Sequence, residues 1–137
     1  MLNHKGTQTI ETSRLILRQA RIEDAEAMFR NWANDPEVTK YLTWPAHESV
    51  AVTQKVLEGW VSEYGRSDYY HWMIVLKETG EPIGSLLASC VGRVPSAHIG
   101  YCIGKDWWHQ GIMTEALSAV IGYLFDEVGF SRIESMH

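Results

Sequence analysis

The chain has 137 residues, of which 45% are hydrophobic and 21% are charged, and its formal net charge is −5. This length supports one hydrophobic core, and this composition excludes a disordered, collagen-like or disulfide-rich chain. The acidic balance argues against nucleic-acid binding, and no apolar run approaches the ~20 residues that a membrane span needs.

Residues 1–10 carry threonines and one glycine without any apolar periodicity, which predicts a flexible N-terminal arm. The same stretch lacks the apolar core of a signal peptide. With only two cysteines in the chain, a disulfide framework is not expected. We therefore expect a cytoplasmic protein.

The first structured part of the chain predicts one strand followed by two helices. Residues 14–18 (RLILR) have the pattern of a strand. Apolar side chains at helical spacing predict a helix over residues 22–32, which the Asn34-Asp35-Pro36 segment ends. A second apolar stripe predicts a helix over residues 47–64, and the loop before it, residues 38–45, contains Tyr41 and Trp44.

The middle of the chain predicts three strands, at residues 69–76, 82–91 and 96–104. The turns at 78–81 and 92–95 leave no room for a crossover helix, so the strands form an antiparallel meander. In such a meander Cys90 and Cys102 lie at opposite ends of paired strands, which argues against a disulfide.

The last third changes to helical periodicity at Ile112, and its apolar stripe runs to Val128 before Gly129 ends the helix. Residues 130–136 then predict a further strand. The order of elements indicates a mixed α+β domain. His47, His71 and His109 have no metal-ligand spacing, so we expect no metal site.

The segment with the clearest chemical potential is the loop between Gly104 and Gly111, which leads directly into the last helix. The first N–H groups of a helix have no intrahelical partners, and the helix dipole makes that end electropositive. Such an end can bind a phosphate or pyrophosphate, and Gly111 lets the anion approach the backbone. The sequence has neither a Walker loop nor a dinucleotide fingerprint.

Three stretches of this sequence resemble one family. Residues 99–117 (IGYCIGKDWWHQGIMTEAL) are similar to motif A of the GNAT (Gcn5-related N-acetyltransferase) superfamily. Within the superfamily, this motif and the opening T-x-R-L-x-L-R strand resemble the branch of the ribosomal-protein N-terminal acetyltransferases. The P-I-G that begins the strand at Pro82 fits the P-x-G-x third strand of the family. The resemblance implies an α+β fold with a mixed, mostly antiparallel sheet flanked by helices.

The resemblance implies acetyl-CoA as co-substrate and no metal. The pantetheine arm is then expected along Tyr101, Cys102 and Ile103, where a backbone amide near Ile103 polarises the acetyl carbonyl. The pyrophosphate is expected on the amides of six consecutive residues: His109, Gln110, Gly111, Ile112, Met113 and Thr114. In the family's Q/R-x-x-G-x-G/A pattern only the central glycine matches strictly, because Trp108 and Met113 replace its first and last residues.

The family often places a glutamate general base at the position of His98, and the resemblance therefore implies His98 as the catalytic base. The alternative for a lone strand histidine is half-buried packing. Glu115 lies in the first helical turn and is interpreted as a charge that complements the helix dipole.

The family's fold continues with a helix and two strands beyond the position of His137, and its usual general acid, a tyrosine or serine, lies in that region. Residues 11–137 are thus expected to be a single GNAT domain, truncated after the fifth strand, without the C-terminal helix and strands.

The leading hypothesis is an N-acetyltransferase that acts on a primary amine, such as a protein N-terminal α-amine. Tyr41, Trp44 and His47 are candidates for binding this acceptor, although aromatic residues there serve packing equally well. A small-molecule acceptor, of polyamine or aminoglycoside-like type, is the first alternative. The second is a CoA-binding chain without turnover, for example one that forms a homodimer.

Overall fold

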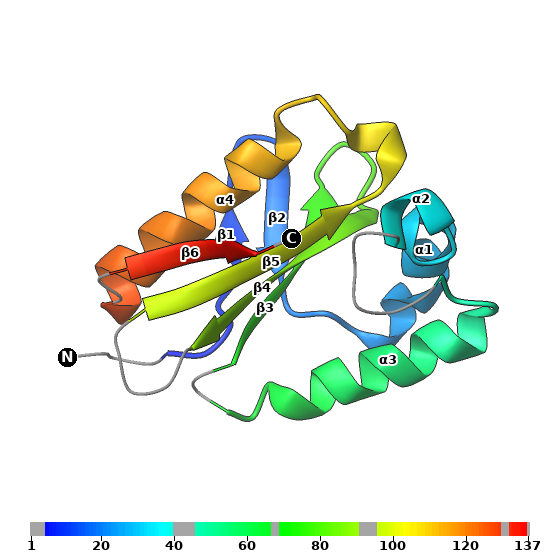
Figure 1. Ribbon diagram of the computed structural model, residues 1–137, viewed down its shortest axis with the longest axis horizontal. Helices are drawn as coiled ribbons and strands as arrows, with labels where there is room; N and C mark the ends of the chain where they lie inside the picture. The colour runs from blue at the N-terminus through cyan, green and yellow to red at the C-terminus, as the bar shows by residue number, and fades with distance from the viewer. Residues whose placement is uncertain (1–4, 40–45, 67–68, 91–95, 130–131, 137) are drawn as a thin grey trace.

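The computed structural model describes residues 5–39, 46–66, 69–90, 96–129 and 132–136. Its centre is a six-stranded sheet with the strands in chain order (Figure 1). All neighbouring strands are antiparallel except β5 and β6, which are parallel. The strands are β1 (Ile10–Glu11), β2 (Leu15–Arg18), β3 (Tyr70–Leu76), β4 (Pro82–Cys90), β5 (Ser96–Ile103) and β6 (Arg132–Met136).

The meander expected from the middle of the sequence is confirmed, since β3 pairs with β4 and β4 with β5 in antiparallel register. Gly80 takes φ 73° in the turn between β3 and β4, a conformation that glycine adopts without steric cost. The β4–β5 register places Cys90 opposite Ala97 and Cys102 opposite Ser85, so the two cysteines lie far apart along the ladder.

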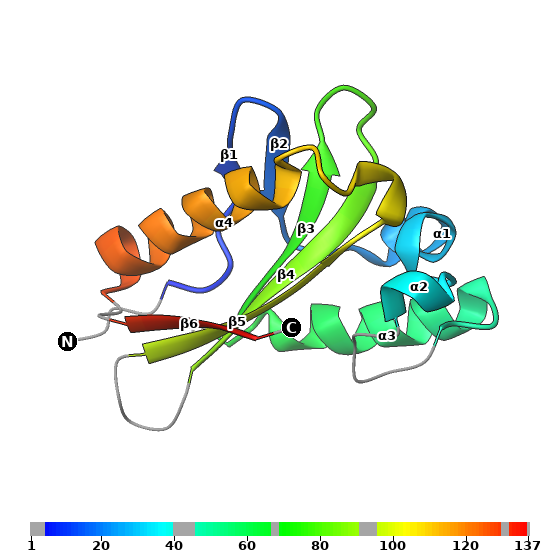
Figure 2. The same cartoon turned by 45° about the horizontal axis from the view of Figure 1, so that its top comes forward.

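Two longer helices lie on opposite sides of this sheet, α3 (Val50–Glu63) and α4 (Ile112–Tyr123) (Figures 1 and 2). The helix α3 starts at Val50 and not at His47, because Ser49 takes an extended conformation and caps it. A π-helical turn, Leu124–Val128, continues α4 to Gly129, as the apolar stripe predicts. In the described part of the chain, no helix is long and apolar enough to cross a membrane.

The helix predicted over residues 22–32 is helical throughout but has three geometries. A 3-10 turn (Ile22–Asp24) leads into α1 (Ala25–Met28), and a π-helical turn (Phe29–Ala33) follows. A short helix that the sequence analysis did not predict, α2 (Pro36–Thr39), comes next. Its first residue is a proline, which a helix tolerates well at that position because the missing N–H would have no helical partner.

Each face of the sheet has its own hydrophobic core. Residues that alternate along the strands, such as Tyr70, Trp72 and Ile74, are fully buried against α4. Their neighbours Met73 and Val75 are buried on the other face, against the α1 and α3 side. The loop before α4 leads into this helix on the same side of the sheet.

Part of the segment expected as a flexible arm is attached to the sheet. Thr7 is 6% exposed, and its hydroxyl donates to the carbonyl of Tyr69 (2.7 Å) and accepts from the N–H of His71 (3.1 Å). The indole N–H of Trp72 donates to the carbonyl of Gln8 at 2.7 Å. These hydrogen bonds satisfy polar groups at the start of β3 that would otherwise be buried without partners.

Candidate functional site

The candidate site is the start of α4 together with the loop that precedes it. A 3-10 turn (Lys105–Trp107) follows β5, and two residues of the loop then adopt the left-handed region, His109 at φ 63° and Gly111 at φ 75°. Gly111 is the N-cap residue of α4, and no side-chain hydrogen bond caps the helix. The N–H groups of Ile112, Met113 and Thr114 are therefore available to a ligand.

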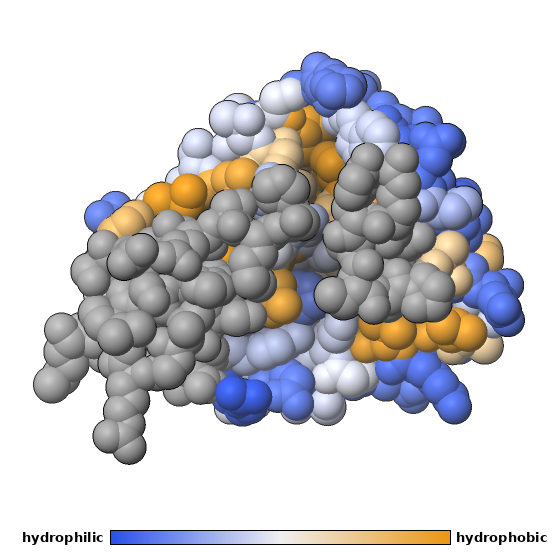
Figure 3. All heavy atoms as spheres, viewed as in Figure 1, coloured by the Kyte–Doolittle hydropathy of each residue, from blue (hydrophilic) through white to orange (hydrophobic). Residues whose placement is uncertain are grey.

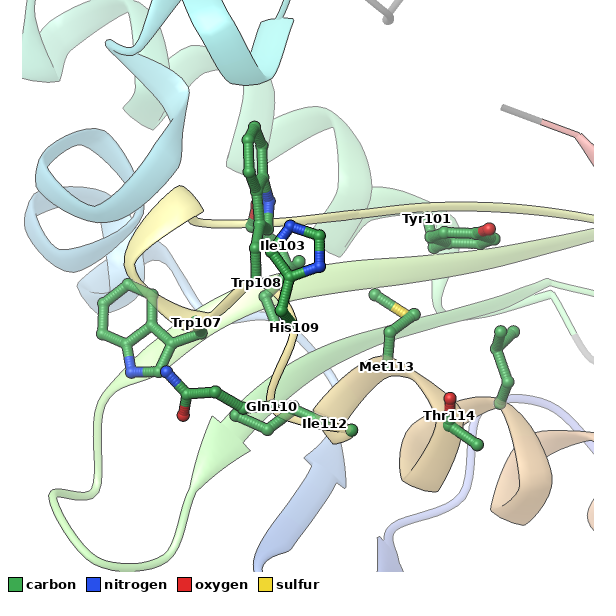
Figure 4. A pocket seen from close by; sticks show the side chains of 11 residues that line it. Tyr101, Ile103, Trp107, Trp108, His109, Gln110, Ile112, Met113 and Thr114 are labelled. Carbon is green, nitrogen blue, oxygen red and sulfur yellow. The ribbon is translucent and has the colours of Figure 1, made fainter.

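A cavity of about 460 Å³ lies between the end of β5 and this helix start. Figure 4 shows Tyr101 on β5 across from Met113 and Thr114 on the first turn of α4, with Trp107, Trp108 and His109 at the loop end. Apolar atoms are visible between the start of α4 and the 3-10 turn at the top of Figure 3. The lining residues are Tyr101, Ile103, Trp107, Trp108, His109, Gln110, Gly111, Ile112, Met113, Thr114 and Leu117.

The cavity is apolar at its walls and polar at the helix start. None of the described residues that line it is a lysine or arginine. The nearby Lys105 ammonium lies 3.6 Å from a carboxylate oxygen of Asp35 and 3.8 Å from one of Glu37. An anion at this position would therefore be bound mainly by backbone N–H groups and the helix dipole, as in other helix-terminus sites.

The last residues of β5 run along the cavity, because Tyr101 and Ile103 both line it. The parallel β5–β6 ladder is described as far as the pair Gly100 and Met136. His98 lies two residues before this last described pair, where its backbone is paired with Ser89 on β4 and Glu134 on β6.

The structure brings together all the residues predicted to contact the co-substrate except Cys102. Tyr101 and Ile103 line the cavity, as do the six predicted residues from His109 to Thr114. The Cys102 side chain lies on the opposite face of the sheet, 3.6 Å from the hydroxyl of Ser85, because adjacent residues of a strand point to opposite faces. Burial raises the pKa of this thiol. Cys102 is not among the residues that line the cavity, and its contact with the co-substrate stays a prediction.

Three lining residues were not predicted: Trp107, Trp108 and Leu117. The indole N–H of Trp108 donates to the carbonyl of Ile103 (2.9 Å), which ties the loop to the end of β5. Leu117 follows Met113 by one helical turn, so the apolar stripe of the helix contained a signal for it.

His47, predicted to bind the acceptor, lies outside the cavity lining. It is buried, with its Nδ1 2.6 Å from the hydroxyl of Thr53 and its backbone N–H donating to the carbonyl of Ala33. Burial lowers the pKa of its imidazole. Tyr41 and Trp44 lie outside the described residues.

Glu115 is engaged in contacts with the β1–β2 hairpin. The hydroxyl of Thr12 donates to its carboxylate, as do the backbone N–H (2.9 Å) and Nε (2.8 Å) of Arg14. The Thr12 hydroxyl first, and then the Arg14 groups, lower the pKa of Glu115 to about 2. A carboxylate this weakly basic is a poor proton acceptor, which agrees with its interpretation as a structural charge.

Among the described residues, no group of three His, Cys, Asp or Glu side chains is arranged so that it could hold a metal ion.

Comparisons with known proteins match most of the chain to one family. The profile of the family described as "Acetyltransferase (GNAT) domain" matches residues 14–137. The Bacillus subtilis protein described as "Uncharacterized N-acetyltransferase YoaA" is 35% identical over 125 residues, which cover 90% of this chain and 70% of that protein. "Uncharacterized N-acetyltransferase p20" of Bacillus licheniformis is 32% identical over 131 residues, 93% of this chain and 72% of its own length.

A solved structure is similar in fold. The ribosomal-protein-S5-alanine acetyltransferase of Vibrio fischeri superposes with a TM-score of 0.78 at 19% sequence identity, covering 93% of this chain and 73% of that one. The α+β fold expected from the sequence is thus confirmed.

Proposed function

The chain belongs to the GNAT acetyltransferase family, and on that premise we propose that it transfers the acetyl group of acetyl-CoA to a protein N-terminal α-amine, with His98 as general base. Acetyl-CoA is the co-substrate that GNAT acetyltransferases use. The proposal therefore concerns the acceptor and the residues that act on it.

The observation that carries the proposal is the uncapped start of α4 facing a cavity that the end of β5 also lines. The backbone N–H groups at the helix start suit a pyrophosphate. The apolar walls and the end of β5 suit a pantetheine arm, which would run from the helix start along Tyr101 and Ile103. The thioester would then lie near the end of the β5–β6 ladder, two residues along β5 from His98.

The chain's own groups have two tasks in direct transfer. The amine nitrogen forms a bond to the thioester carbonyl carbon, the C–S bond breaks, and the thiolate leaves. A backbone N–H near Ile103 would stabilise the negative charge on the carbonyl oxygen. His98 would accept the proton that the ammonium group must lose before or during attack. Glu115 is unsuited to this task, because three hydrogen bonds already occupy its carboxylate.

A protein N-terminus is favoured as acceptor by the resemblance of the T-x-R-L-x-L-R strand and motif A to the ribosomal-protein branch. The similarity in fold to a ribosomal-protein-S5-alanine acetyltransferase supports the same choice. A small-molecule amine is the competing outcome, and an acceptor panel separates the two.

The test measures CoA release from acetyl-CoA with peptides that begin with serine or alanine, with the same peptides blocked at the α-amine, and with spermidine and an aminoglycoside. We expect turnover with the free peptides only. Turnover confined to spermidine or the aminoglycoside would contradict the acceptor proposal. Acetyl-CoA binding without turnover on any of them would contradict the enzymatic role of this chain.

The role of His98 is tested by His98→Ala. We expect kcat to fall by about 100-fold, the usual contribution of a general base, with an unchanged Kd for acetyl-CoA by calorimetry. The variant should also lose the acidic limb of the pH–rate profile. An unchanged profile and rate would exclude His98 as the base.

A further inference from the structure

An arginine from the N-terminal part of the chain, Arg14, makes hydrogen bonds to the start of α4, which forms the proposed co-substrate site. Arg14 lies just before β2, and the β1–β2 hairpin brings it against the first turn of α4 (Figure 2). Its side chain does not line the cavity. Its hydrogen bonds nevertheless reach two residues at the start of α4: Gln110, which precedes Gly111, and Glu115, in the first helical turn.

The guanidinium of Arg14 makes a fork with two acceptors. Nε donates to the Glu115 carboxylate (2.8 Å), and Nη1 donates to the backbone carbonyl of Gln110 (3.0 Å). Nη2 has no hydrogen-bond partner among the described residues and lies 3.6 Å from the point that a Cβ on Gly111 would occupy. A planar guanidinium can hold two acceptors in this fixed geometry, whereas a single ammonium cannot reproduce it.

The bond to Gln110 has a consequence for the next peptide N–H. All described peptide bonds are trans, so the carbonyl of Gln110 and the N–H of Gly111 point in opposite directions. When Arg14 holds that carbonyl towards the hairpin, the Gly111 N–H is directed away from the hairpin. Gly111 lines the cavity, and the left-handed φ of 75° keeps this peptide turned.

The ion pair has a second consequence. Glu115 places a negative charge in the first turn of α4, although it is not among the residues that line the cavity. An unpaired carboxylate there would repel a pyrophosphate. Arg14 compensates this charge, so the helix start remains favourable for an anion.

We propose that Arg14 is a positioning residue for the pyrophosphate of acetyl-CoA: it turns the Gln110–Gly111 peptide so that its N–H serves the anion, and it neutralises Glu115. This role rests on the proposed function, because it presumes that the helix start binds the co-substrate. It predicts an effect on ligands that carry the pyrophosphate and no effect on ligands that lack it.

The test compares the binding of CoA, by calorimetry, with the binding of pantetheine, by NMR titration, for four variants of the full chain. Arg14→Gln should weaken CoA binding by about tenfold or more, the loss of one charge-assisted hydrogen bond, and leave pantetheine binding unchanged. Arg14→Lys should restore less than half of that loss in free energy. Glu115→Gln, which keeps the Arg14–Gln110 bond, should change the Kd of CoA by no more than about twofold.

Arg66→Gln is the matched control, since Arg66 is an exposed arginine paired with Glu63 at the end of α3. Equal weakening of CoA and pantetheine by Arg14→Gln, or an equal effect of Glu115→Gln, would mean that Arg14 only docks the hairpin and would overturn the proposal. Full rescue by lysine would overturn the peptide-turning role. A wild-type chain that binds no CoA would instead refute the proposed function, and the role of Arg14 with it.

Discussion

The two long helices of this chain begin in opposite ways. At the start of α3, Ser49 is extended and its hydroxyl accepts a hydrogen bond from the N–H of Val52. At the start of α4, Gly111 is left-handed and offers no side chain to the first turn. The first helix end has a side-chain acceptor for one of its N–H groups, and the second has none and faces a cavity. The difference agrees with the proposal that the start of α4 binds the co-substrate, while the cap of α3 contributes to stability.

The surroundings of the two helix ends agree with this division. The face of the sheet on the α3 side holds a buried histidine in an aromatic cluster, where the ring centroids of Trp60 and His71 are 4.2 Å apart. The α4 side holds the cavity and the loop with two left-handed residues. Left-handed conformations at non-glycine residues such as His109 are uncommon, and they are often retained at functional sites.

The largest effect is expected from a negative charge at the open helix end. Gly111→Glu should weaken acetyl-CoA binding by about 100-fold or more, because it adds a negative charge at the helix start and because its side chain strains the left-handed φ of 75° that this loop requires. Gly122→Glu, on the same helix but with open space around its Cβ, is the matched control and should bind normally. Calorimetry on both variants gives the comparison, and equal affinities would place the site elsewhere.

We expect acid to lower the stability of the folded chain through His71, which lies on the α3 side of the sheet. Burial lowers the pKa of His71 to about 3 from its ordinary value of 6.5. As the pH falls below 6.5, the unfolded chain therefore takes up a proton that the folded chain does not. The free energy of unfolding should fall by about 1.4 kcal/mol per pH unit from this group alone.

The His71 contribution is obtained from urea unfolding of the wild type and of His71→Phe between pH 7 and pH 5. The wild type should lose stability more steeply than the variant over this range, because phenylalanine cannot titrate. Parallel curves for the two proteins would show that His71 is solvated or protonated in the folded state.

The smallest effect is expected at the capped helix end. Ser49→Ala removes the side-chain acceptor of α3, and the free energy of unfolding should decrease by about 1 kcal/mol. The Kd for acetyl-CoA should not change, since Ser49 does not line the cavity. A loss of acetyl-CoA affinity without a loss of stability would contradict the division between the two helix ends.

The sequence predicts the fold and the loop that lines the cavity well because both depend on local patterns. Alternating apolar residues and short turns specify the β3–β4–β5 meander, and the helical stripe from Ile112 specifies α4. Gly111 marks the start of α4 because the N-cap residue is left-handed, a conformation that glycine adopts without steric cost. The start of α3 was missed by three residues, although Ser49 is a strong capping signal.

Contacts between distant segments could not be predicted in the same way. Arg14 and Glu115 are 101 residues apart in sequence, and only the packing of the hairpin on α4 brings them together. His47 was predicted to bind the acceptor, but the fold buries its imidazole against Thr53. Cys102 lies between two lining residues, yet strand alternation turns its side chain to the other face of the sheet.

The most direct test of the account is a map of backbone amide shifts by ¹⁵N NMR as acetyl-CoA is added. The largest changes should fall on the N–H groups of Gly111, Ile112, Met113 and Thr114, with the first turn of α3, residues 50–53, unaffected. Shifts centred on that turn of α3, or an unchanged α4 start at saturating acetyl-CoA, would contradict the assignment of the open helix end as the co-substrate site.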